Sequence, residues 1–464
     1  MKKSVLLIIA LGFLFSVHSQ NKQILYGFDK IPQGLLLNPG AETTYKYHIG
    51  VPFLSGNSVN GNISGLTIAD VFRDDGIGIF AGTDFNVKLR NAIAGISNED
   101  YAAINTQVEI LNGGYKINKR DYLSVGFYSE ADVFFTLPKD LFTLADEGNA
   151  AYLGRSFSLS HTSIKADVLG VLHAGISRRI NNQLTVGARL KIYSGSVNIT
   201  STHNEGTFTT REGQDNIYEH LLQNVDAGIY SSGIFNENNE SIISAGSAFG
   251  NTFFGGNFGL GFDVGFTYHY NEQVEFTASL VDVGFLSYSK NTRNATVKGS
   301  YTFSGVEFEY DNQNTDYWQN LEDDFNSQVD TDENNDSYSV IRPIKFFSSG
   351  RYSFGKSRNN NTCHDITFKD FYDNAVGGQL YAVYRPNGVR FAFTGFYERK
   401  FSKYLNTKFT YTIDDFSASN FGVGLSVNVW KLNVYGMVDN VFQLSDVADS
   451  HRSTAQLGIN FIFN

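Results

Sequence analysis

Long runs in which apolar and polar residues alternate restrict most strongly what this chain can fold into. The clearest runs lie at 123–137, 184–192 and 258–270. Successive side chains of a β-strand point to opposite faces, so each run predicts a strand with one apolar and one polar face. Several runs exceed about ten residues, which is longer than typical soluble strands and fits the tilted strands that cross a bilayer. A soluble β-sandwich is the alternative that regular strand spacing leaves open.

The N-terminus has the pattern of a secretory signal peptide. Lys2 and Lys3 precede an apolar run, Val5–Val17, and the triplet 17–19 has small or slightly larger residues at its first and third positions. The run is too short to cross a bilayer of about 30 Å as a helix. We expect residues 1–19 to be a signal peptide that is cleaved between Ser19 and Gln20. An N-terminal core helix is the alternative.

No later segment has a continuous apolar run long enough for a membrane helix. A membrane location then requires a closed barrel, because only helices and barrels satisfy every backbone group in hydrocarbon. The 40 Phe, 26 Tyr and 45 Gly suit strands and interfacial aromatic girdles. We therefore predict an all-β fold: a transmembrane antiparallel β-barrel of about 14 strands over residues 44–464, integral to the outer membrane of a Gram-negative cell.

Three segments lack the alternation. Residues 20–43 contain Pro32, Pro39 and Gly40 and are predicted to plug the lumen. Residues 201–254 are polar, and residues 311–337 are strongly acidic. Because barrels place long loops outside and short turns in the periplasm, both segments are predicted to be external loops.

Charged residues on the polar faces are the candidate lumen residues. Glu130 and Asp132 share one face of a predicted strand, and Arg189 and Lys191 share a face of another. We interpret these four as structural ion pairs. The sequence predicts no catalytic residue, no cofactor-binding residue and no metal ligand, and hence no enzyme.

Two motifs have a plainer explanation than ligand binding. Residues 350–357 match the phosphate-loop pattern, but they alternate as a strand and no helix follows, so we interpret them as barrel wall. Residues 330–336 partly match a calcium loop but lack its glycine and final glutamate. The net charge of −11 argues against a nucleic-acid partner, which requires a basic face.

The chain ends in a final alternating run. Its apolar set is Leu457, Ile459, Phe461 and Phe463. We predict that this strand is read by the barrel-assembly machinery during biogenesis. The other expected partners are outer-membrane lipid and further secretion or envelope proteins.

Several motifs resemble one group of outer-membrane proteins. Asn38-Pro39-Gly40 is similar to the Asn-Pro-Ala element near the start of FadL-like transporters and of the PorV and PorP/SprF proteins of Bacteroidota. Segments 137–142, 187–195, 279–284 and 435–461 also match, so the resemblance covers nearly the whole mature chain. It implies a FadL-like barrel with an inward N-terminal segment.

The resemblance leaves two functions open. PorV and PorP/SprF relatives serve type IX secretion and gliding, which implies an accessory or partner-binding component. FadL carries hydrophobic ligands through an opening in its wall, which implies a channel for small hydrophobic molecules. A barrel hydrolase is a third alternative, without a catalytic motif to support it.

Overall fold

A computed structural model describes most of the chain. The described residues are 22–72, 83–213, 217–235, 241–242, 244–305, 317–357, 368–386, 388–414, 420–443 and 447–463. The predicted signal cleavage site at Ser19 and Gln20 lies outside them. None of the described helices is long and apolar enough to cross a membrane.

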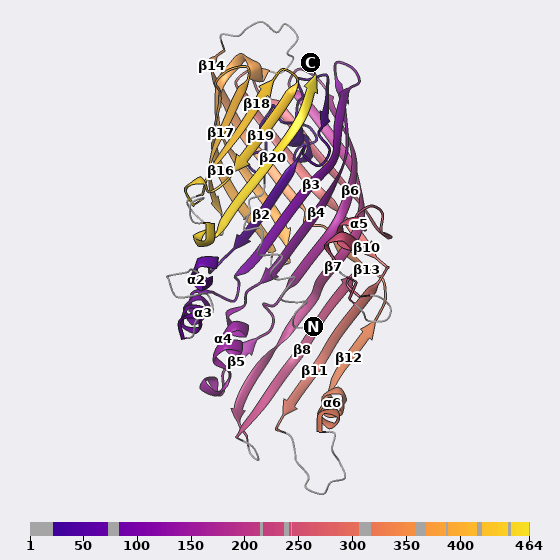
Figure 1. Cartoon of the computed structure of the whole chain (residues 1–464), viewed down its shortest axis with the longest axis vertical. Helices are drawn as coiled ribbons and strands as arrows, with labels where there is room; N and C mark the ends of the chain where they lie inside the picture. Colours follow the sequence, from indigo (N-terminus) through magenta and orange to yellow (C-terminus); the bar gives the residue numbers. More distant parts are fainter. Residues whose placement is uncertain are drawn as a thin grey trace.

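Within the described residues, one antiparallel sheet of twenty strands curls into a closed barrel and continues beyond one rim (Figure 1). The barrel has 14 strands around its circumference, as predicted. Its wall consists of β1 (Tyr47–Gly50), β2 (Asn57–Ile63), β3 (Tyr101–Lys116), β4 (Asp121–Thr136), β6 (Ile164–Arg179), β7 (Leu184–Glu212), β9 (Asn257–His269), β10 (Val274–Tyr288), β13 (Tyr338–Ile341), β14 (Lys345–Lys356), β15 (Tyr372–Arg385), β16 (Gly388–Lys400), β17 (Leu405–Asp414), β18 (Asn420–Val429), β19 (Leu432–Val438) and β20 (Arg452–Phe463).

The barrel closes between its first and last strands. β1 and β2 lie end to end, and both pair with β20 on one side and with β3 on the other. β13 and β14 likewise lie end to end along β10, so the segments of the wall make 14 strands. Residues 51–56 interrupt this first strand, and Phe53 there has a φ of 62°. The ring is closed, so it leaves no open sheet edge in the wall.

Side-chain alternation follows the wall as the sequence predicted. Leu190 is 72% exposed on the outer face, whereas its neighbours Arg189 and Lys191 are each about 2% exposed on the inner face. Along β9 every second residue from Phe258 to Tyr268 is an exposed apolar or aromatic side chain. An apolar outer band around a polar interior is the surface pattern of a membrane barrel.

The segment 201–254, expected to be a long loop, is largely ordered sheet. β7 continues past the rim to Glu212 and pairs there with β8 (Tyr218–Ser232). β8 pairs with β11 (Thr292–Phe303), and β11 pairs with β12 (Val329–Asn334). β5 (Ser156–Ser158) pairs with the other side of β7. We call β5, the end of β7 from Thr200, β8, β11 and β12 the protruding sheet (Figure 1).

The expected loop at 311–337 is also partly regular. Its described residues form α6 (Tyr317–Gln328), β12 and the short link that leads to β13. Both faces of the protruding sheet lie beyond the rim, where polar side chains are tolerated on each side. The strands of the protruding sheet therefore lack the apolar face that marks the wall strands. For this reason their polar sequence wrongly predicted loops.

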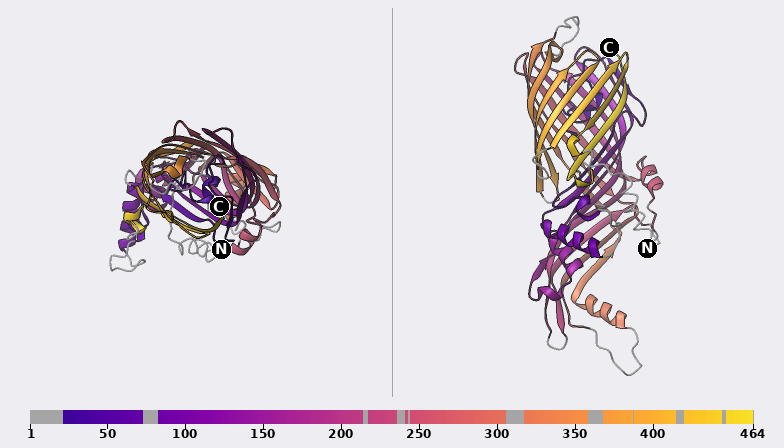
Figure 2. Two further views of the ribbon diagram at one scale, coloured as in Figure 1. Left: turned by 90° about the horizontal axis from the view of Figure 1, so that it is seen from above. Right: turned by 60° about the vertical axis from the view of Figure 1, so that its left-hand side comes forward.

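Long connections gather at the rim that carries the protruding sheet, whereas the other rim has mostly short turns (Figure 2). The remaining helices are α2 (Ile68–Phe72), α3 (Thr83–Gly95), α4 (Lys139–Glu147) and α5 (Ala245–Gly250), with short 3-10 turns at Pro32–Leu36 (η1), Ala150–Tyr152, Phe368–Phe371, Val441–Gln443 and Val447–Asp449. The first and last barrel strands place Tyr47 beside Phe463 at the short-turn rim.

Candidate functional site

Residues 22–43 lie inside the barrel and contact several parts of its wall. Gln33, in η1, donates to Glu109 on β3 (2.7 Å) and to Asn460 on β20 (2.9 Å). The carbonyl of Tyr26 accepts from Gln379 on β15 (2.9 Å) and from Lys408 on β17 (2.6 Å). The segment therefore joins strands that are far apart in the sheet and occupies part of the lumen.

The Asn-Pro-Gly motif rests on a floor made of two glycines. Gly187 on β7 and Gly265 on β9 are direct cross-strand partners. A β-carbon at Gly187 would lie 2.0 Å from the carbonyl oxygen of Pro39, and one at Gly40 would lie 2.4 Å from the carbonyl oxygen of Gly265. Only glycine permits backbones to approach this closely. Asn38 completes the contact, because its side chain donates to the carbonyl of Phe266 (3.1 Å) and accepts from the Gly40 amide (2.9 Å).

Wall side chains also bind the backbone carbonyls on either side of this motif. Ser279 donates to the carbonyl of Leu37 (2.6 Å), and Thr267 donates to that of Gly40 (2.9 Å). Arg189 donates to the carbonyl of Leu35 (2.7 Å). Buried carbonyls need such partners. Three motifs that are far apart in the sequence, around positions 38, 187 and 279, thus form one docking site for the N-terminal segment.

A buried ion-pair network adjoins the docking site. Lys191 lies 2.9 Å from Asp263 on β9 and 2.5 Å from Asp282 on β10. Arg189 lies 3.3 Å from Asp263. Lys345 on β14 then reaches Asp282 at 2.8 Å. Asp282 occupies a β-bulge with a φ of 63°, and its backbone amide donates to Oδ1 of Asp263 (2.8 Å).

The network continues across the lumen. Arg342, between β13 and β14, lies 3.0 Å from Glu130 on β4. Arg385 on β15 pairs with Asp132 on β4. Five strands (β6, β7, β9, β10 and β14) separate β4 from β15 around the wall, so this pair spans the interior. These ion pairs and the N-terminal segment together occupy part of the lumen over the described residues.

All four charged residues singled out from the sequence lie in this network, on the inner face of the wall. Their principal partners were not singled out: Asp263, Asp282, Arg342, Lys345 and Arg385. Asp263 lies on the polar face of the alternating run 258–270. This position indicated that its side chain points into the lumen. Arg342 lies in a short link between two strands, where alternation gives no indication of side-chain direction.

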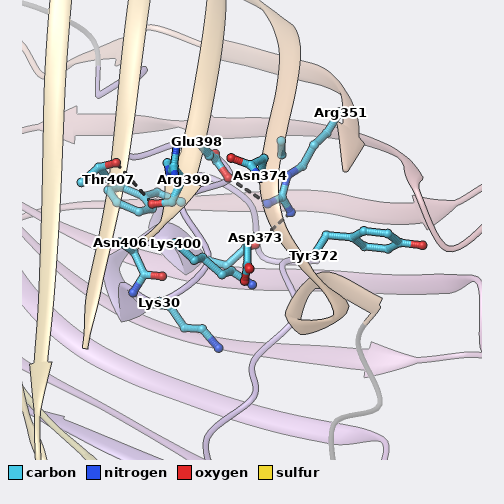
Figure 3. Close-up of a pocket in the computed structure, with 13 residues that line it drawn as sticks. Lys30, Arg351, Tyr372, Asp373, Asn374, Glu398, Arg399, Lys400, Asn406 and Thr407 are labelled. Carbon is cyan, nitrogen blue, oxygen red and sulfur yellow. Dashed lines mark hydrogen bonds and ion pairs between the residues drawn. The ribbon is translucent and has the colours of Figure 1, made fainter. Parts of the chain in front are cut away.

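Small polar cavities remain inside the barrel. One of about 460 Å³ is bordered by the network residues Glu130, Lys191, Asp282 and Lys345 together with Lys22. Burial lowers the pKa of the Lys22 ammonium to about 8, although nearby Glu130 and Asp282 favour its charged form. Another cavity of about 310 Å³ lies near the short-turn rim, where Arg351 contacts Glu398 (Figure 3).

The last strand contributes to the outer surface. Leu457 and Phe461 are exposed on β20, and Ile459 and Phe463 are half-buried on the same face. Phe463 stacks on Tyr47 with ring centroids 4.3 Å apart. The residues predicted to form an assembly strand therefore face outward beside the closing strand of the barrel.

The 350–357 motif lies almost entirely in β14, in the barrel wall, as interpreted from its alternation. Asp330 and Asp332 lie in β12, where their backbones pair with Lys298 and Thr296 of β11. This extended backbone does not have the tight turn of a calcium loop.

A model of one protein family matches residues 39–439. The chain belongs to the family of unknown function DUF5723. The match begins at Pro39 and includes the glycine floor, the ion-pair network and the protruding sheet of this DUF5723 protein. No curated protein matches the sequence.

Solved structures similar to this DUF5723 chain include three outer-membrane transporters or homologues. The toluene transporter TbuX of Ralstonia pickettii is 10% identical, with a TM-score of 0.42 over 95% of this chain and 99% of TbuX. A FadL homologue of Pseudomonas aeruginosa is 9% identical, with a TM-score of 0.45 over 95% of this chain and 96% of the homologue. The toluene transporter TodX of Pseudomonas putida is 10% identical, with a TM-score of 0.39 over 94% of this chain and 97% of TodX.

Proposed function

We propose that this DUF5723 protein is a non-enzymatic barrel of the Gram-negative outer membrane that binds a partner outside the membrane. The proposal rests on the N-terminal segment and the ion pairs inside the lumen, together with a sheet that extends well beyond the rim. A lumen crossed by ion pairs leaves little room for continuous flow, whereas the protruding sheet offers a large folded surface.

The arrangement of connections supports one orientation. Outer-membrane barrels place short turns in the periplasm and long connections outside the cell. The rim with short turns then faces the periplasm, and the protruding sheet faces outward. The resemblance to PorV and PorP/SprF proteins of Bacteroidota suggests that the partner belongs to the type IX secretion or gliding systems.

Site-specific photo-crosslinking tests this function. A photoreactive amino acid at Ile217, which is 81% exposed beside the β7–β8 connection, is expected to capture an envelope protein in living cells. The matched control is position 403, exposed in the short turn between β16 and β17 at the opposite rim. Crosslinks at 403 but none at 217, or no adduct at either position, would contradict the proposed binding surface.

A second candidate function is a channel for small hydrophobic molecules. The interruption of the first barrel strand at 51–56 favours it, because this part of the wall lacks regular pairing and exposes Phe53 and Leu54. Uptake of a labelled hydrophobic compound into proteoliposomes tests this function. Faster uptake than in empty liposomes supports a channel, and equal rates argue against it.

A further inference from the structure

Three ligand-type side chains meet at one place near the short-turn rim. Glu42 follows the Asn-Pro-Gly motif, His269 ends β9, and Glu275 lies near the start of β10. One ligand atom from each lies within 4.8 Å of the other two. Their side chains are only 6%, 4% and 7% exposed, respectively. Buried acidic side chains normally need a compensating cation or several hydrogen bonds.

The geometry around His269 brings the two carboxylates to one imidazole. Nε2 of His269 lies 2.8 Å from Oε2 of Glu42, and Nδ1 lies 3.7 Å from Oε2 of Glu275. Thr185 donates to Oε1 of Glu42 at 2.9 Å and orients that carboxylate. The ring of Phe368 packs edge-on against the imidazole with centroids 5.4 Å apart.

Arg351 is a compensating cation close to this cluster. It stands opposite Glu275 in the β10–β14 pairing, and its charge interacts with Glu275. However, its two terminal nitrogens contact Asp29 (3.0 Å) and Glu398 (2.9 Å). Figure 3 shows Arg351 directed toward Glu398. The guanidinium therefore shares its charge among three carboxylates, those of Asp29, Glu398 and Glu275.

We propose that Glu42, His269 and Glu275 bind a divalent transition-metal ion of the zinc class, with water in a fourth position. One imidazole nitrogen and two carboxylate oxygens form a ligand set that suits Zn²⁺. Ligands about 2.1 Å from a tetrahedral zinc lie about 3.4 Å apart, between the 2.8 Å contact of Glu42 and the 3.7 Å contact of Glu275 with the imidazole. Because these two carboxylates face different ring nitrogens, one of them must turn toward the nitrogen that binds the ion. Ca²⁺ and Mg²⁺ fit poorly, since they prefer more oxygen ligands and no imidazole.

Such an ion would fasten the N-terminal segment to the wall. Glu42 belongs to that segment, whereas His269 and Glu275 belong to adjacent strands of the wall. The ion would thus join the three at the end of the Asn-Pro-Gly docking site. This inference needs only the described cluster, and it stands whether the protein binds a partner or conducts a solute.

Calorimetric titration of the mature full-length protein tests the proposal. The protein is purified in detergent without a polyhistidine tag, stripped with EDTA, freed of the chelator and titrated with Zn²⁺. We expect one Zn²⁺ per chain and no competition from excess Ca²⁺. His269→Gln and Glu275→Gln should each weaken binding at least about tenfold, since metal-site substitutions outside the direct ligands already cost about 10–100-fold. The control His161→Gln, a half-buried histidine between β5 and β6, should bind like wild type.

The competing interpretation is that hydrogen bonds hold His269 between the two glutamates without a metal. It predicts no saturable Zn²⁺ binding, or binding that neither His269→Gln nor Glu275→Gln weakens, and either result overturns the proposal. X-ray absorption at the zinc edge of the loaded wild type does not depend on how the variants fold. One imidazole nitrogen with oxygen ligands supports the site, whereas several imidazoles or a shell of oxygen alone contradict it.

Discussion

A β-carbon at Gly187 would lie 2.0 Å from the Pro39 carbonyl oxygen, in the backbone of the N-terminal segment. Gly187→Val therefore displaces that segment or strains the wall, and overpacking of this kind costs about 1–3 kcal/mol. We expect cells that carry the variant to become more sensitive to vancomycin, which an intact outer membrane excludes. Gly395→Val is the matched control, because no atom lies within 4 Å of its added β-carbon. Equal sensitivity of the two variants would contradict the docking role of Gly187.

The buried carboxyl group of Asp439 should make the stability of the folded protein depend on pH. Burial raises the pKa of its carboxyl group to about 7, against about 3.9 for an aspartate in an unfolded chain. The folded state thus favours the neutral form, and its contribution to stability is full below pH 4 and lost as the pH rises through 7. Asp439→Asn should unfold at a higher temperature than wild type at pH 8, with a smaller difference at pH 5. Heat-modifiability on electrophoresis gels measures the unfolding temperatures of the variant and of wild type. A difference that stays constant from pH 5 to pH 8 would show that the Asp439 carboxyl group is not its cause.

Substitution of Arg342 tests whether the ion pairs across the lumen stabilise the barrel. Removal of one member of a buried pair leaves an unpaired charge and costs about 3–5 kcal/mol. Arg342→Met should therefore lower the urea midpoint of unfolding because Glu130 loses its 3.0 Å partner. The double variant Arg342→Met, Glu130→Gln should recover much of the loss. A single variant as stable as wild type would show that the pair has no structural role.

The sequence predicted these charged residues better than their connections. Alternation placed Glu130 and Arg189 on an inner face because a strand reverses its side-chain direction at every residue. Their partners depend on which strands meet across the lumen, and a single sequence holds no such information. Asp282 turns inward only because a bulge shifts the register between Leu280 and Val283.

At the scale of elements, β7 shows where the pattern loses its predictive value. From Leu184 to Ile192 one face meets the apolar surroundings of the wall, so apolar and polar residues alternate. Beyond the rim the same strand continues to Glu212 with polar residues on both faces. The strand is held there by β5 and β8, and this long-range pairing leaves no period-two signal in the sequence.

Thr207 lies at the centre of this outer part of β7, between Ser158 of β5 and Gln223 of β8. Proline is poorly tolerated in a central strand, since it cannot donate to the ladder. Thr207→Pro should open the protruding sheet and allow added trypsin to cleave after Arg211 in intact cells. The barrel should keep wild-type heat-modifiability, because the 14-strand ring does not include this part of β7. If the variant lost both its resistance to trypsin and its heat-modifiability, the sheet and the barrel would fold as one unit.

At the scale of the whole molecule, the sequence predicted the class of fold and the number of wall strands. Hydrophobic alternation was sufficient because every wall strand meets the same two environments. The docking site for the N-terminal segment was not predicted, although Asn38 and Gly187 belong to two of the motifs that carry the family resemblance. Only the closed ring brings β7, β9 and the N-terminal segment together.

The central claim is that the N-terminal segment, docked on the glycine floor and the wall side chains, closes the lumen, so that function belongs to the surface beyond the rim. Planar-bilayer recording of the mature protein, beside a variant that lacks residues 22–43, tests it most directly. We predict that wild type inserts without steady conductance and that the truncated barrel gives large, stable steps. Equally large, stable steps from wild type would contradict a closed lumen and favour the channel.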